Sequence, residues 1–384
     1  MQLMKHKSST VAALTGAAMS LPAFAATQPA ESTISVSLSQ YHEADIPSDK
    51  VVAGSNERYD IEVGKFKLVT PIGADWSLTV DTTRETMSGA SPWGTLYGTT
   101  GEPNLIMSGA TISESRTALA ISSTRYTDKA SYTLGVSKSE ENDYKATSYQ
   151  VAGEWDREDK LSTFALAFSY SSDELSPTDA VLYGRVPEAN QRSRSISGSW
   201  TQVLSKNAVL QSGISLTKKD GYLSDPYKLL DVRPDEKTQW AVSLRYRRFY
   251  DNRNAALHLD YRYYDDDWGI DSHTIDLSWH QNLGLGFQLV PRIRIYSQAE
   301  ASFFEAADDY RLPRDQPQSS DYRLSGYGAL SVGLKAIYKI PAWTVSLSVD
   351  QYRSDERFGH NKSQYEHPAL LDFTLTNLGL EYRF

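Results

Sequence analysis

The stretches Trp240-Ala-Val-Ser-Leu-Arg-Tyr246 and Leu257-His-Leu-Asp-Tyr-Arg-Tyr263 decide the fold, because every second residue in both is large and apolar or aromatic. The residues between them are small, polar or charged. A β-strand points successive side chains to opposite faces, so a period of two predicts a strand with one apolar and one polar face. The same alternation runs through residues 76–80, 164–170 and 275–279.

Working outward from these stretches, we count sixteen segments of this kind. They lie at residues 33–43, 57–69, 75–87, 111–125, 130–142, 144–157, 161–173, 191–204, 208–219, 236–249, 255–266, 270–281, 285–299, 321–339, 342–354 and 369–384. Each has room for the roughly 9–11 residues with which a tilted strand crosses a bilayer. The sequence therefore predicts an all-β protein, a transmembrane antiparallel up-and-down β-barrel of about 16 strands.

The connections and the tryptophans support a barrel over a soluble sandwich. Short turns, such as 205–207 and 282–284, alternate with long segments, such as 88–110 and 300–320. We predict that the short turns face the periplasm and the long segments face outward. The tryptophans expected at the membrane–water interfaces are Trp76, Trp155, Trp200, Trp279 and Trp343 beside short turns, and Trp240 at the opposite end of its strand. A soluble sandwich gives tryptophan no reason to gather beside one set of turns.

The N-terminus has the pattern of a secretory signal peptide. Lys5 and Lys7 precede an apolar run, and Ala23-Phe24-Ala25 has the small-x-small pattern of a cleavage site. We expect a signal peptide at residues 1–25 and the barrel at 26–384. A short membrane anchor is the alternative, but the apolar run is too short to span a bilayer.

Composition excludes several classes of protein. The chain has no cysteine, so it has no disulfides or thiolate metal sites. Its net charge of −9 becomes −11 without the signal, which argues against nucleic acid as a partner. Mean hydropathy is −0.47, and beyond the signal no apolar run is long enough for a transmembrane helix.

The last strand has the pattern of an assembly signal. Leu380, Tyr382 and the terminal Phe384 alternate with polar residues, and such a tail resembles the signal that the barrel-assembly machinery reads. Leu371, Phe373 and Leu375 have the opposite parity, so we predict a β-bulge near residues 376–377. A similar parity change lies between Val63 and Phe66.

The alternation also assigns side chains to the barrel interior. Strands three to nine point mainly small side chains inward. The later strands place a charged wall in the lumen: Arg245, Arg247, His258, Asp260, Arg262, Asp276, His280, Arg292, Arg294 and Lys335. One interpretation is a charged constriction that favours anions, because Arg outnumbers Asp. The other is a structural ionic network that fills the wall.

Catalysis and metal binding have weaker support. His258 and His280 could serve an inward Ser, but Ser–His chemistry needs hydrogen-bond reach and these histidines face Arg-rich surroundings. We expect no enzymatic activity and no cofactor. Asp265, Asp266 and Asp267 could bind a hard cation such as calcium, although a solvated acidic turn is the commoner outcome. His42, His360 and His367 lack ligand spacing and are interpreted as surface residues.

One segment resembles a known family. Asp260-Tyr-Arg-Tyr-Tyr-Asp-Asp-Asp-Trp-Gly-Ile-Asp-Ser-His-Thr274 is similar to a recurring segment of an uncharacterised bacterial outer-membrane barrel family, a domain of unknown function. Residues 88–92, 170–179 and 294–298 also resemble it, and the resemblance covers essentially the whole mature chain. The resemblance implies an outer-membrane barrel. It also implies that members of the family are encoded beside a small lipoprotein, a thioredoxin-like protein and a flavin transferase. It assigns no functional residue.

Together these observations predict a protein of the Gram-negative outer membrane, in contact with its lipid. The first functional hypothesis is a porin-like channel. The second is a scaffold or conduit for a periplasmic or surface partner, such as a redox protein or a lipoprotein. A lumenal enzyme is the weakest of the three.

Overall fold

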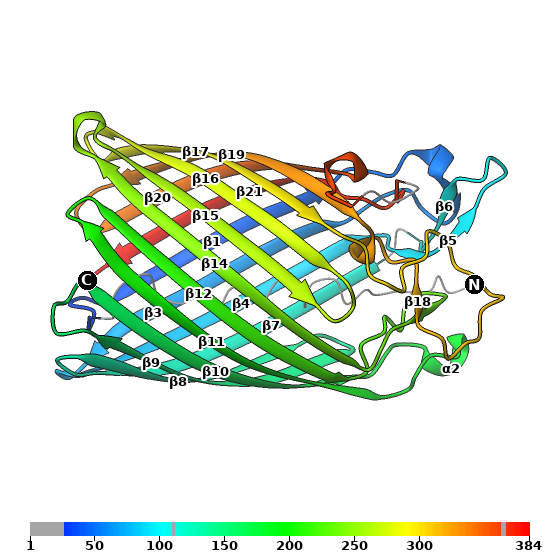
Figure 1. Ribbon diagram of the computed structural model, residues 1–384, viewed down its shortest axis with the longest axis horizontal. Coiled ribbons are helices and arrows are strands. Elements are labelled where there is room, and N and C mark those ends of the chain that lie inside the picture. Colours follow the sequence, from blue (N-terminus) through cyan, green and yellow to red (C-terminus); the bar gives the residue numbers. More distant parts are fainter. Residues whose placement is uncertain (1–26, 110–111, 362–365) are drawn as a thin grey trace.

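The computed structural model describes residues 27–109, 112–361 and 366–384, and within them sixteen strands form one closed antiparallel barrel (Figure 1). In chain order they are β1 (Thr33–Glu43), β3 (Asp60–Ile72), β4 (Trp76–Gly89), β7 (Ile112–Tyr126), β8 (Ala130–Glu140), β9 (Tyr144–Asp156), β10 (Ser162–Leu175), β11 (Ala189–Ser205), β12 (Ala208–Gly221), β14 (Glu236–Tyr250), β15 (Ala255–Asp266), β16 (Asp271–Gly284), β17 (Phe287–Gln298), β19 (Tyr327–Lys339), β20 (Trp343–Asp355) and β21 (Asp372–Arg383). Pairing of β1 with β21 closes the barrel, so no strand of the barrel is left with an open edge.

The predicted fold class is confirmed, and each of the sixteen predicted segments overlaps one barrel strand. The largest difference in bounds lies in the predicted strand 321–339. It begins at Tyr327, because Tyr322–Leu324 form a 3-10 turn in which the Asp321 carboxylate accepts from the Arg323 N–H. The predicted signal peptide, residues 1–25, lies outside the described residues. No helix in the described ranges has the length and apolarity to cross a bilayer.

The outer wall of the barrel is apolar. Leu166 and Leu347 are each 50% exposed, and alternate residues of the other strands expose apolar side chains in the same way. In a soluble protein these side chains would be buried, because burial of a Leu or Val side chain is worth about 1.5–3 kcal/mol. The alternation in the sequence therefore marks which face is outside and which faces the interior of the barrel, the lumen.

Aromatic rings lie near both ends of the wall. At the end with the short turns, on the left in Figure 1, Trp343 packs on Tyr382 with ring centroids 4.4 Å apart, and Tyr250 lies 5.6 Å from Trp279. At the end with the long loops, Trp240 lies 5.4 Å from Tyr263. We call these the short-turn end and the loop end.

The two parity changes in the sequence are not bulges, and the predicted bulge at residues 376–377 is wrong. The β1–β21 register is continuous from Thr33–Arg383 to Glu43–Phe373, and β3 pairs with both its neighbours without a shift. Instead the lining of the lumen changes. Phe373 points inward and packs between Tyr41 and Tyr352, at 4.6 and 4.5 Å between centroids. Towards the loop end, the inside of this part of the barrel is therefore apolar.

The largest fully buried side chains among the described residues lie in the loops, among them Leu105, Gln318 and Asp321. A three-stranded sheet of β2 (Val51–Ala53), β6 (Pro103–Met107) and β5 (Pro92–Tyr97) lies at the loop end. A second pairing joins β13 (Asp231–Val232) to β18 (Gln318–Ser319). One apolar cluster there unites side chains of four connections: Ile46, Ala90, Leu105, Met107, Tyr322 and Ala369. The long loops are thus an ordered layer with a core of their own, which we call the loop cap.

Candidate functional site: the charged wall of the lumen

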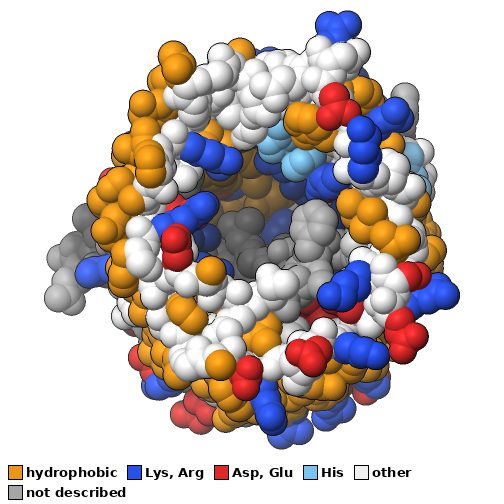
Figure 2. Space-filling view, turned by 90° about the vertical axis from the view of Figure 1, so that its left-hand side faces the viewer, with side chains coloured by type: hydrophobic (Ala, Val, Ile, Leu, Met, Phe, Trp, Pro, Cys, Tyr) orange, Lys and Arg blue, Asp and Glu red, His pale blue; other side chains and the backbone are white. Residues whose placement is uncertain are grey.

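The structure places all ten residues of the predicted charged wall on β14 to β19, at positions that alternate with the exposed apolar side chains. Seen from the short-turn end, the barrel is hollowed, and Lys, Arg and His side chains line part of the opening (Figure 2). Across the lumen, β7 to β12 turn mainly small side chains inward. The sequence could predict this asymmetry because strand alternation fixes each side chain's face.

Strand register arranges the charged wall in rows. Arg245, Asp260, Asp276 and Arg294 face one another across β14, β15, β16 and β17. The next row towards the short-turn end holds Arg247, His258, Ser278 and Arg292. Each aspartate therefore has two arginines within reach, one directly opposite and one in the adjacent row.

Both aspartates are bonded by the adjacent row. Arg247 donates through two guanidinium nitrogens to Asp260, one at 2.9 Å. Arg292 binds Asp276 in the same forked manner, with Nε 2.9 and 3.0 Å from the two carboxylate oxygens. Forked arginine–carboxylate pairs are strong and fix both partners. The structural-network interpretation thus holds for these two pairs.

The other three arginines of the charged wall are Arg245, Arg262 and Arg294. Arg245 donates to the Gln211 side chain at 3.3 Å, and Arg262 lies over the Tyr264 ring at 5.1 Å. Neither of them, nor Arg294, has a carboxylate partner in the described part of the chain. The described side chains of the charged wall therefore carry more positive than negative charge.

The rings of His258 and His280 lie 3.9 Å apart between centroids, with His258 in the row of Arg247 and Arg292 and His280 nearer the short-turn end. Ser278 Oγ lies 3.2 Å from His280 Nε2, because the two residues are neighbours on one face of β16. Within the described ranges no carboxylate binds either imidazole, so the third member of a Ser–His–Asp arrangement is missing there.

A second charged cluster lies in the loop cap. The Asp321 side chain is fully buried and accepts from Arg233 at 2.8 Å and from Arg323 at 2.9 Å. Arg323 also reaches Asp225 at 3.1 Å, and Arg233 reaches Asp231 at 2.9 Å. Burial alone raises the pKa of Asp321, but Arg323, Lys228 and Arg233 hold that pKa well below its ordinary value. This cluster ties the β12–β14 loop to the β17–β19 loop.

The sequence analysis did not predict this cluster, although a short sequence pattern marks some of its residues. Asp-x-Arg occurs six times, at residues 231–233, 251–253, 260–262, 309–311, 321–323 and 355–357. In four of them, at 231–233, 309–311, 321–323 and 355–357, the guanidinium folds back onto the aspartate two residues earlier. The motif predicts a local clamp in a loop, but the sequence cannot show that two of the four clamps meet in a buried position.

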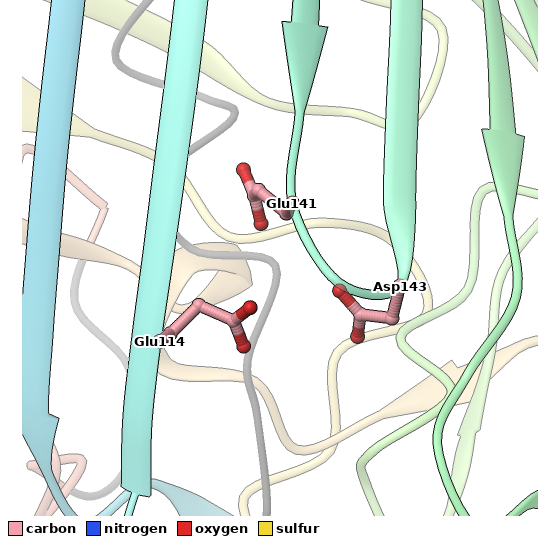
Figure 3. A group of neighbouring side chains, drawn as sticks. All are labelled: Glu114, Glu141 and Asp143. Carbon is pink, nitrogen blue, oxygen red and sulfur yellow. The ribbon is translucent and has the colours of Figure 1, made fainter.

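Three carboxylates meet at the loop end of β7 to β9. Figure 3 shows Glu114 on β7, with Glu141 and Asp143 from the β8–β9 turn, pointing towards one another. Their oxygens lie within 4.8 Å of one another, and Asn142 donates to Glu114 at 3.2 Å. Burial, Asp143 and Glu114 raise the pKa of Glu141 to about 7. Such oxygens could hold a hard cation. The sequence alone did not indicate this group, because Glu114 is far in sequence from Glu141 and Asp143.

We expect stability at this turn to depend on pH. The pKa of Glu141 is raised in the fold, so its contribution is intact below the ordinary value of 4.5 and is lost as pH rises to about 7. Glu141→Gln should therefore stabilise the β8–β9 turn at pH 8, by about 1–2 kcal/mol after allowing for partial exposure, and change nothing at pH 4. Hydrogen exchange measures this. Glu158→Gln, at a 90% exposed side chain, is the control and should not change the stability of the turn at pH 4 or pH 8.

The aspartates predicted as a weak cation site have separate partners. Asp265 accepts from Trp240 Nε1 at 2.9 Å, and Asp267 accepts from the Thr238 N–H at 2.9 Å. Asp266 is buried, pairs with Lys237 at 2.7 Å, and accepts from two backbone N–H groups of its own turn. The three carboxylates thus order the turn that joins β15 to β16.

One histidine prediction is wrong. His367 is buried, not exposed, and its Nε2 lies 2.9 Å from the Ser320 carbonyl oxygen in the loop cap. Burial lowers its pKa to about 4, so the ring is neutral at physiological pH. Its position beside the cap core could not be read from a lone histidine in a loop.

Comparison with solved structures finds barrels at low sequence identity. CdiB from Acinetobacter baumannii matches at 9% identity and a TM-score of 0.53, over 92% of this chain and 60% of that one. A bacterial polysaccharide outer membrane secretin matches at 7% identity and 0.49, over 92% and 98%. OccD3 (OpdP) from Pseudomonas aeruginosa matches at 12% and 0.41, over 94% and 93%. This chain thus spans about 60% of CdiB, and at such identity that likeness speaks for the fold alone.

Comparison with curated protein sequences found no match. A family model described as "Protein of unknown function (DUF3570)" matches residues 8–368, nearly the whole chain. This agrees with the resemblance carried by the Asp260–Thr274 segment. The chain has the fold of bacterial outer-membrane β-barrels and belongs to the DUF3570 family.

Proposed function

We propose that this protein spans the outer membrane as a channel that favours anions. The apolar outer wall supports a lipid environment, because only a closed barrel or a helix satisfies its backbone hydrogen bonds in hydrocarbon. Aromatic rings near both ends suit the two membrane–water interfaces. The signal peptide predicted at residues 1–25 supports export.

The proposal includes an orientation and a route of assembly. The short-turn end faces the periplasm, and the loop cap faces outward. Leu380 and Tyr382 lie on the outer wall, and Phe384 is 57% exposed beside Tyr382. These three residues are therefore accessible to the barrel-assembly machinery at the strand that closes the barrel.

The proposed anion preference rests on the charged wall, in which the arginines outnumber the aspartates that could pair with them. Arg245, Arg262 and Arg294 lie on one wall of the lumen, and the nearest aspartates are already bonded to Arg247 and Arg292. Inside a low-dielectric wall, unpaired charges act over longer distances than in bulk water. Anions in the lumen are thus stabilised relative to cations.

The test is ion selectivity in planar bilayers. With a potassium chloride gradient, the wild-type reversal potential should show chloride preferred over potassium. Arg294→Gln removes an unpaired cation and should lower that preference about two- to threefold. Asp276→Asn removes a carboxylate and should raise it, which provides a control of opposite sign at the neighbouring strand. Equal reversal potentials in all three proteins would contradict the proposal.

The loop cap is the observation that favours the second candidate function, a scaffold or conduit for a periplasmic or surface partner such as a redox protein or lipoprotein. Tyr227 of the β12–β14 loop donates to Asp143 on the β8–β9 turn and accepts from the Thr178 N–H at 3.1 Å. Lys228 reaches the Pro92 carbonyl at 3.3 Å. The cap thus joins connections from several sides of the barrel. Absence of any conductance, with co-purification of a partner, would favour the scaffold.

A further inference from the structure

We propose that a recess in the lumen wall between β11 and β15 is a binding site for a small oxyanion of the carboxylate or phosphate type. This deepens the proposed function, since it names the class of solute that the channel would hold. The recess includes two arginines of the charged wall, Arg245 and Arg262, and its other lining residues are uncharged and lie on β11, β12 and β14.

Strand register makes the recess. Ser199, Gly213, Ser243 and Arg262 face one another in one row across β11, β12, β14 and β15. Three small residues in succession leave the wall thin at this row. The long Arg262 side chain bounds the resulting recess on one side. A Cβ at Gly213 would meet Ser243 Oγ at 2.9 Å, so the absence of a side chain there keeps the floor open.

The recess has the size of a small solute. Its volume is about 120 Å³, and its lining residues are Ser197, Ser199, Gln211, Gly213, Ile214, Ser215, Ala241, Ser243, Arg245 and Arg262. One buried water needs only about 10–15 Å³ by a comparable measure. A phosphate or a short dicarboxylate therefore fits within it.

The charges in the recess have one sign. Arg245 and Arg262 line it, and none of the lining residues is acidic. Arg245 is steadied by Gln211 at 3.3 Å, and Gln211 in turn donates to Thr201 at 3.1 Å. A guanidinium group presents paired N–H donors whose geometry matches carboxylate and phosphate oxygens.

The hydroxyl groups of the recess point to the same class of ligand. Elsewhere on the inner face, hydroxyls on adjacent strands bond to each other, as Ser195 does to Thr217 at 2.7 Å and Thr124 to Thr133 at 2.8 Å. The four serines of the recess make no side-chain hydrogen bond to another described residue: Ser197, Ser199, Ser215 and Ser243. They are therefore available as donors to a bound oxygen, next to two arginines without a carboxylate.

The experiment is equilibrium binding to the folded barrel in detergent, which does not require conduction. Succinate and inorganic phosphate are titrated by isothermal calorimetry at constant ionic strength, with choline as a cation. We expect saturable binding of at least one oxyanion and none of choline. The combined variant Arg245→Gln/Arg262→Gln should weaken that binding at least tenfold, because it removes both forked donors.

Two further variants separate the recess from the general charge of the lumen. Gly213→Val fills the floor, keeps every charge and suits a strand, so it should also abolish binding. Arg294→Gln lies outside the recess and should leave binding within about twofold while it lowers anion selectivity. Circular dichroism verifies that each variant is folded.

The outcomes distinguish this inference from the channel proposal. Wild-type protein that binds neither oxyanion, or a double variant that binds as well as wild type, overturns the oxyanion site even if the channel conducts anions. Binding that depends on Arg245 and Arg262 supports the site even if no conductance is found.

Discussion

Asp321→Ala should open the loop cap while the barrel stays folded. The substitution removes a fully buried carboxylate and leaves the partly buried Arg233 and Arg323 with one carboxylate each, and loss of one partner from a buried ionic group costs about 3–5 kcal/mol. That cost falls on the loops, because Arg233 and Arg323, which bind the Asp321 carboxylate, belong to the loop cap. We expect trypsin to cleave the variant after Arg323 at least tenfold faster than wild type.

The loop that holds Asp321 also provides the matched control. Asp309 pairs with Arg311, a residue whose side chain is 89% exposed, in the same Asp-x-Arg pattern. Exposed pairs contribute little to stability, so Asp309→Ala should leave the cleavage rate unchanged. If Asp321→Ala were as resistant to trypsin as wild type, the buried cluster would not be what holds the cap together.

Leu347→Arg should destabilise the whole barrel. Leu347 lies in the middle of β20 on the apolar outer wall and is half exposed. An arginine on the lipid face near the bilayer midplane costs about 2–4 kcal/mol. The urea midpoint for unfolding from lipid vesicles should fall accordingly, as followed by tryptophan fluorescence.

Ser346→Arg is the control for this position, one residue earlier on the same strand. Ser346 points into the lumen and faces Gly379 on β21, so water can solvate the new charge there. Its unfolding midpoint should stay within about 1 kcal/mol of wild type. A larger loss from Ser346→Arg than from Leu347→Arg would reverse the assignment of the two faces.

The sequence predicts the barrel wall well because the wall follows a local pattern. An apolar outer face and a largely polar inner face require alternation within each strand, so Trp240–Tyr246 alone reveals both faces. The same alternation places Arg245 and Arg262 inside. The false bulge at residues 376–377 arose from the assumption that the lumen is polar throughout, whereas Phe373 packs inward between two tyrosines.

The loop cap and the pairing of the lumen charges could not be predicted, because both depend on distant contacts. Arg233 and Asp321 are 88 residues apart, and Arg323 and Asp225 are 98 apart. No periodicity links such residues. In the lumen, the sequence places Asp260 near both Arg245 and Arg247. Only the side-chain geometry shows that Arg247 is the arginine that donates to Asp260.

The most direct test of the central claim is labelling of single cysteines along β20 in lipid vesicles, because the chain has no cysteine of its own. The reagent is a water-soluble, membrane-impermeant maleimide, and the positions are residues 345 to 349. Cysteine at Ser346 and Ser348 should react, and cysteine at Val345, Leu347 and Val349 should not. Equal reactivity at all five positions, or the reverse alternation, would contradict a barrel with lipid outside and water inside.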